Sequence, residues 1–198
     1  MAAIERAAED AKLSHLKKES SRSYVLIFTA TIGTVFGVNI LFELLQITQK
    51  SEIYQAIRED QYAASLLVGL ICYGVISAFS EEVLFRGILY NALKRTMNVK
   101  LAMVLSAFLF GAYHMNNVQG TYGFVMGCLM AFGYEYFGSF LIPVAIHMVS
   151  NILAYAMGYT PIGNTGFVSW PACMAFLVLG VGSIFFLVKE KDMLQKTS

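Results

Sequence analysis

Charged residues are scarce in this sequence, and their scarcity excludes an ordinary soluble fold. Only 14% of the 198 residues are charged, whereas 57% are hydrophobic and the mean hydropathy is +0.61. A soluble domain usually carries about 25% charged residues, because a polar surface must cover its core. The formal net charge is +1 and the sequence has no basic stripe, which excludes nucleic acid as a partner.

Paired cysteines and a zinc-peptidase motif are also missing. Cys72, Cys128 and Cys173 lie far apart inside apolar stretches, and no CxxC pair suggests a metal or redox site. We therefore expect all three to be small packing residues. The HExxH pattern of zinc peptidases does not occur either.

Long apolar runs separate the few charged residues along the sequence. A transmembrane helix needs about 20 predominantly apolar residues, and this length predicts an all-α, polytopic helix bundle with about six membrane segments. The second run continues past its apolar part to Arg95 without a break, so its helix is too long for one upright span. The expected segments are Tyr24–Leu45, Tyr62–Phe79, Leu101–His114, Tyr122–Phe137, Ile142–Met157 and Trp170–Val188.

Basic residues set the expected orientation, because lysine and arginine in short flanks favour the cytosolic side. Of the 14 lysines and arginines, five precede Tyr24, three lie between Lys94 and Lys100, and three follow Val188. We expect both termini in the cytosol and a multi-pass location in the cell membrane, with the lipid bilayer around one domain. That domain is residues 24–188, between a cytosolic juxtamembrane helix at 1–23 and a cytosolic tail at 189–198.

Ionisable side chains at membrane depth are costly, so they are the first candidates for function. Glu82 and Arg86 are one helical turn apart and can form a charge pair. Glu81 points about 100° away from that pair, which leaves it as the candidate general base. The other ionisable residues in the spans are His114, Glu135 and His147, and for Glu135 we expect a structural role.

Helix geometry brings the candidates to one depth. At a rise of about 1.5 Å per residue, Glu81 and His114 each lie about 20 Å from the basic turn at Lys94–Lys100. A carboxylate and an imidazole at one level can polarise a water molecule between them. His147 and Asn151 are one turn apart on another helix, where both can donate to a developing oxyanion.

Three short motifs carry a family resemblance. EExxxR occurs at Glu81–Arg86, FxxxH at Phe110–His114 and HxxxN at His147–Asn151, in that order along the chain. With these motifs the sequence resembles the CPBP family, which comprises CAAX proteases and bacteriocin-processing enzymes and is also called Abi. The short length and minimal loops look like the bacterial branch.

The resemblance implies an intramembrane endopeptidase. Glu81 and His114 would activate water, while His147 and Asn151 would hold the oxyanion. Glu82, Arg86 and Phe110 would support the site. The substrate would be a peptide or protein at the membrane, lipidated or not, of the CAAX or bacteriocin-leader type.

Metal dependence and two other functions are the alternatives to this interpretation. Glu81, His114 and His147 could hold a zinc ion, as in a metalloprotease. Asn151 is a poor zinc ligand, so we favour glutamate chemistry with no cofactor. A non-catalytic bacteriocin-immunity or scaffold protein would keep the fold without needing Glu81. A proton-coupled transporter would also bury carboxylates and histidines, but such transporters usually contain internal repeats, and this sequence has none that we can detect.

Overall fold

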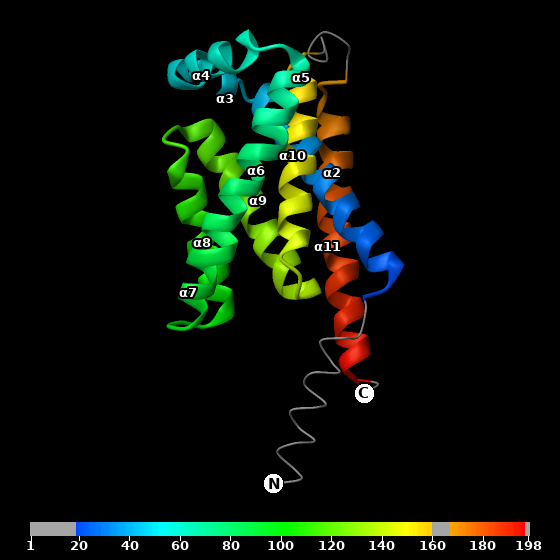
Figure 1. Cartoon of the computed structure of the whole chain (residues 1–198). Helices are drawn as coiled ribbons and strands as arrows, with labels where there is room; N and C mark the ends of the chain where they lie inside the picture. Colours follow the sequence, from blue (N-terminus) through cyan, green and yellow to red (C-terminus); the bar gives the residue numbers. More distant parts are fainter. Residues whose placement is uncertain (1–18, 160–166, 197–198) are drawn as a thin grey trace, which may run out of the picture.

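The fold is a bundle of long helices capped at one end by two short ones (Figure 1). The computed structural model describes residues 19–159 and 167–196, and within these ranges it contains no strand. Most of the expected juxtamembrane helix at 1–23 lies outside the described residues, and the first described helix begins at Ser21. The tail predicted at 189–198 continues the last helix as far as Lys196.

Twelve helical elements follow one another along the described residues. They are α2 (Ser21–Leu44), α3 (Ile47–Lys50), α4 (Glu52–Ala63), α5 (Leu66–Gly69), η1 (Leu70–Ser77), α6 (Ala78–Glu82), η2 (Val83–Tyr90), α7 (Asn91–Lys94), α8 (Val99–Tyr113), α9 (Asn117–Phe137), α10 (Leu141–Gly158) and α11 (Trp170–Lys196).

The elements from α5 to α7 form one continuous helix, Leu66–Lys94, with 29 residues. Its length confirms that the second apolar run is too long for one upright span. The predicted start at Tyr62 is wrong, because Tyr62 belongs to α4 and the hydroxyl of Ser65 accepts from the amide of Val68 to cap the long helix. Two stretches, η1 and η2, have π-helical geometry, which is rare and often found at functional sites.

Among the described residues, four helices are long and apolar enough to cross a membrane: Ser21–Leu44, Leu66–Lys94, Leu141–Gly158 and Trp170–Lys191. The other two expected segments are helices α8 and α9, which form a hairpin beside the long helix. Helix α8 is apolar but has only 15 residues, and α9 is not one of the four spanning candidates. The chain is a multi-pass helical membrane protein, as the sequence predicted.

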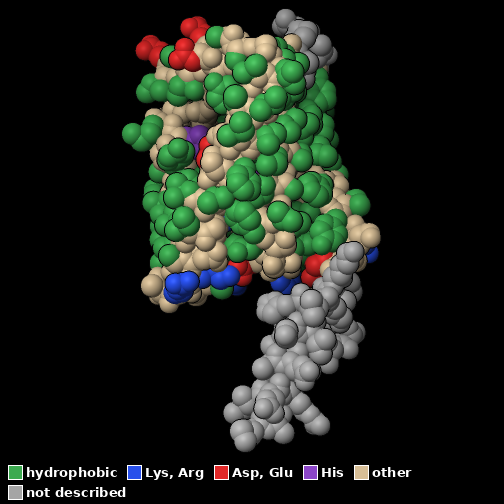
Figure 2. Space-filling model, viewed as in Figure 1, with side chains coloured by type: hydrophobic (Ala, Val, Ile, Leu, Met, Phe, Trp, Pro, Cys, Tyr) green, Lys and Arg blue, Asp and Glu red, His purple; other side chains and the backbone are tan. Residues whose placement is uncertain are grey.

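The two ends of the bundle carry different charges. The hydroxyl of Ser20 donates to Glu190 at 2.8 Å, which brings the start of α2 beside the end of α11. Lys94 at the end of α7 forms an ion pair with Glu135 of α9, which fits the structural role expected for Glu135. Figure 2 shows basic side chains along this lower rim, with acidic ones among them, and acidic side chains at the opposite, upper rim.

Candidate active site

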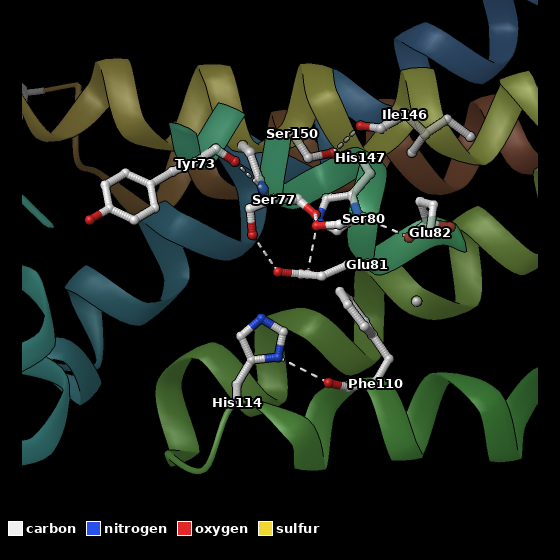
Figure 3. A network of polar contacts seen from close by, with 12 residues as sticks. Tyr73, Ser77, Ser80, Glu81, Glu82, Phe110, His114, Ile146, His147 and Ser150 are labelled. Atoms are coloured by element: carbon white, nitrogen blue, oxygen red, sulfur yellow. Dashed lines mark hydrogen bonds and ion pairs between the residues drawn. The ribbon is translucent and has the colours of Figure 1, made fainter. Parts of the chain in front are cut away.

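The candidate residues come from three helices that meet around one cavity near the α4 end of the bundle. Glu81 lies in α6, His114 caps the C-terminus of α8, and Asn151 lies in α10. All three line a cavity of about 330 Å³. His147, one turn before Asn151, is buried behind the cavity wall. In Figure 3 the imidazole of His114 lies opposite the carboxylate of Glu81.

Glu82 is the centre of a fully buried network behind the cavity. Its Oε1 atom accepts from Arg86 Nη1 at 2.7 Å and from His147 Nδ1 at 2.9 Å. Glu82 and Arg86 are both 0% exposed, so the ion pair predicted from their spacing is present and each charge compensates the other. The contact with His147 was not predicted, because the two residues are 65 positions apart in the chain.

Arg86 connects this network to the helix hairpin. Its Nη2 atom donates to the carbonyl oxygen of Gly127 at 2.9 Å, and its guanidinium lies 4.9 Å from the centre of the Phe110 ring. Phe110 also packs edge-on against both histidines, with ring centres 5.0 Å from His114 and 5.4 Å from His147. Arg86 and Phe110 thus contact the candidate site residues directly, and their supporting role stays a prediction.

Glu81 faces the cavity and has two polar neighbours. The Ser77 hydroxyl donates to its Oε1 atom at 2.5 Å, and His147 Nε2 lies 3.7 Å from its Oε2 atom. The side chain is 16% exposed, against 0% for Glu82. Sequence reasoning missed Ser77, although Ser77 and Glu81 are one helical turn apart and that spacing could have identified the contact.

The hydrogen bond of His114 determines which ring nitrogen is available. Nδ1 lies 2.9 Å from the carbonyl oxygen of Phe110, which can only accept, so Nδ1 carries a proton. In the neutral imidazole Nε2 is then free to accept a proton or a hydrogen bond. Gly123 leaves room for this ring, since a Cβ atom there would lie 3.3 Å from His114 Cε1.

Asn151 uses one of its two amide hydrogens within the protein. Its Nδ2 atom donates to the carbonyl oxygen of Tyr73 in η1 at 3.0 Å. A side-chain amide has two N–H donors, so the second remains for a ligand in the cavity that Asn151 lines.

Helix α4 covers the cavity, and sequence reasoning did not assign it to the site. Tyr54, Gln61 and Tyr62 of α4 line the cavity. The Tyr62 hydroxyl donates to the carbonyl oxygen of Tyr155 at 3.3 Å, and the Tyr155 hydroxyl donates to the carbonyl oxygen of Gln61 at 2.9 Å. Burial raises the pKa of Tyr62 to about 12, and burial also raises the pKa of Tyr54. Both phenols therefore stay uncharged near neutral pH.

The side chains do not form a metal-binding cluster. Across residues 19–159 and 167–196, no group of three or more His, Cys, Asp or Glu residues is arranged to hold a metal ion. His147 Nδ1 is committed to Glu82, so within this arrangement only its Nε2 atom faces Glu81. The alternative zinc set of Glu81, His114 and His147 stays a prediction, because a histidine whose Nδ1 atom is held by a carboxylate can still bind a metal through Nε2.

Comparison with known proteins gives a family match for the central segment of the chain. Residues 63–153 match a family model described as Rce1-like, type II CAAX prenyl endopeptidase, and this range contains every candidate residue. A Bacillus subtilis (strain 168) protein provisionally named membrane peptidase YdiL is 26% identical over 137 residues, which are 69% of this chain and 55% of that protein. The match therefore spans about half of that relative's length. No solved structure matches the chain.

Proposed function

We propose that this chain, whose residues 63–153 match the Rce1-like family model, is an intramembrane endopeptidase that hydrolyses a peptide bond in a membrane-associated substrate. The main observation behind the proposal is that two adjacent glutamates have different surroundings. Glu82 is fully buried and paired with Arg86, whereas Glu81 faces the cavity beside His114. A scaffold protein would have no need for the second, solvent-accessible carboxylate.

Glu81 and His114 are suited to activate a water molecule. Glu81 accepts the proton of a water held between its carboxylate and His114 Nε2, and the hydroxide attacks the carbonyl carbon of the substrate. The Ser77 hydrogen bond fixes one carboxylate oxygen and leaves the other to face the water. When the tetrahedral intermediate collapses, the C–N bond breaks and Glu81 returns its proton to the leaving amine.

Asn151 and His147 are suited to hold the oxyanion. The free amide hydrogen of Asn151 can donate to it directly. His147 can donate from Nε2 only when the imidazole is doubly protonated, because its Nδ1 hydrogen points to Glu82. The Nδ1 atom lies 2.9 Å from Glu82 and the Nε2 atom 3.7 Å from Glu81. We therefore assign Glu82 to orient His147 rather than to touch the substrate.

The test is proteolysis by purified protein in lipid vesicles. Wild type and Glu81→Gln are incubated with a peptide library and with a CAAX-type peptide, and products are identified by mass spectrometry. Glu135→Gln is the matched control, since Glu135 is a glutamate in an ion pair with Lys94 at the end of the bundle. We expect Glu81→Gln to lose cleavage and to keep its fold, and Glu135→Gln to keep both. Near wild-type turnover by Glu81→Gln would contradict the general-base assignment, and a wild type without any turnover would favour the immunity or scaffold alternative.

A further inference from the structure

The cavity lies toward the end of the bundle opposite the basic rim. Its upper wall is built by Thr48, Tyr54, Gln61 and Tyr62, all from the segment that connects α2 to the long helix. Helices α3 and α4 of this segment cap the upper end of the bundle in Figure 1. Figure 2 shows a hollow beneath the acidic upper rim, in which histidine and acidic side chains are visible.

The protein interior closes the path from Glu81 toward the basic rim. Arg86 and Tyr90 follow Glu81 along the long helix, and both are 0% exposed. Phe110 packs beside Arg86 and is 2% exposed. A peptide that reaches Glu81 must therefore enter through the upper hollow, since these side chains fill the bundle on the other side.

Charge assigns the two ends to the two sides of the membrane. Short flanking segments rich in lysine and arginine stay in the cytosol, and five basic residues lie around the end of α7, the start of α8 and the end of α11: Lys94, Arg95, Lys100, Lys189 and Lys191. The segment at 45–65 contains only Lys50 and Arg58 as basic residues, against Glu52, Glu59 and Asp60. The cavity thus lies toward the extracytosolic end of the bundle.

The wall of the cavity combines polar groups with tyrosine rings and carries no lysine or arginine. Asn39, Thr48, Gln61, Gln119 and Asn151 supply amide and hydroxyl groups. Phe42, Val118 and Ala154 are the lining residues without a polar side-chain atom. The amide and hydroxyl groups of such a wall can hydrogen-bond an extended peptide backbone.

We infer that the substrate is an extended peptide segment that enters from the extracytosolic side beneath α4. This inference rests on the proposed peptidase function and adds to it the side of the membrane. The cleaved bonds lie in extracytosolic segments of the substrate.

The side of entry is tested without reference to activity. Single cysteines are placed in the cavity wall by Gln119→Cys and Gln61→Cys and at the basic rim by Thr96→Cys, a position that is exposed. A membrane-impermeant maleimide is added to spheroplasts or to inverted vesicles, and the unsubstituted chain, whose three native cysteines lie in membrane helices, gives the background. We expect both cavity cysteines to react in spheroplasts and Thr96→Cys to react in inverted vesicles. The reverse pattern would overturn the inference and leave the peptidase proposal intact.

The substrate is tested by mapping new chain ends in membranes from cells that produce wild type or Glu81→Gln. We expect the ends that depend on Glu81 to lie in extracytosolic segments. Ends in cytosolic segments would overturn the inference while supporting peptidase activity. If no end depends on Glu81, the peptidase function fails and the substrate inference fails with it, whatever side the labelling shows.

Discussion

The Nδ1 atom of His147 lies 2.9 Å from Oε1 of Glu82, so a fully buried carboxylate of the long helix holds the imidazole of α10 in place. The same oxygen atom accepts from Arg86 at 2.7 Å. One glutamate therefore links a buried positive charge to a ring that faces the candidate catalytic residue. This link makes it possible to separate loss of stability from loss of chemistry by mutation.

Arg86→Ala should lower both the folded yield and the activity. The change leaves Glu82 as an uncompensated buried charge, which typically costs about 3 to 5 kcal/mol. The double variant Glu82→Ala with Arg86→Ala removes that charge and should recover yield, but not activity, because His147 then loses the partner of its Nδ1 atom. For each variant we measure the thermal unfolding temperature in detergent and the turnover. A double variant less stable than Arg86→Ala would show that the two charges do not compensate each other.

Ser77→Ala should lower turnover with little change in stability. The Ser77 hydroxyl orients Glu81 by a hydrogen bond of 2.5 Å, and hydrogen bonds to charged groups are worth about 1.5 to 3 kcal/mol. We expect kcat to fall about 10-fold to 100-fold with KM almost unchanged, because Ser77 acts through Glu81. Ser80→Ala is the matched control, since the Ser80 hydroxyl donates only to the backbone carbonyl oxygens of Ile76 and Ser77. Equal losses in the two variants would argue against a positioning role for Ser77.

The sequence predicted the contacts that helical periodicity determines. Glu82 and Arg86 are one turn apart, and their ion pair is present because that spacing places both side chains on one helix face. Apolar runs of spanning length likewise predicted where the long helices lie, and the depth argument agrees with the presence of Glu81 and His114 in one cavity. These features are local, or follow from the helix rise alone.

Contacts between distant helices could not be predicted in this way. The bond from His147 to Glu82 and the bond from Asn151 to the Tyr73 carbonyl depend on how α10 packs on the long helix. Helix α4 was missed as a wall of the cavity because its amphipathic segment has no motif and its position depends on tyrosine contacts with α10. The catalytic roles of the site residues stay predictions, since they depend on chemistry that packing does not test.

Gly123→Ala should lower turnover without lowering stability. A Cβ atom at this position would lie 3.3 Å from Cε1 of His114, so the ring must shift by a few tenths of an ångström. Displacement of a catalytic group by about 1 Å can cost about 100-fold in rate, and we expect a loss of about 10-fold here. Alanine is also the better helix former by up to about 1 kcal/mol. Gly182→Ala on α11 is the control, because no atom lies within 4 Å of the added Cβ.

The oxyanion assignment predicts a specific loss for Asn151→Ala. If the free amide hydrogen of Asn151 donates only to the developing oxyanion, its removal should lower kcat about 100-fold to 1000-fold, equivalent to about 2.7 to 4 kcal/mol, with little change in KM. The bond from Asn151 to the Tyr73 carbonyl is lost as well, so thermal unfolding must be measured beside turnover. Unchanged turnover in Asn151→Ala would contradict the assignment.

His147→Ala distinguishes oxyanion stabilisation from zinc chemistry. As an oxyanion donor His147 should behave like Asn151, with a fall in kcat and no change in metal content. If His147 is instead a zinc ligand together with Glu81 and His114, His147→Ala should lose the bound metal. A chelator should then inhibit the wild type reversibly. The two mechanisms both use the Nε2 atom of His147 and differ in metal content. We therefore measure the moles of metal per mole of purified protein, and turnover with and without chelator. Stoichiometric zinc that disappears in His147→Ala would replace the glutamate mechanism by a metal-dependent one at the same residues.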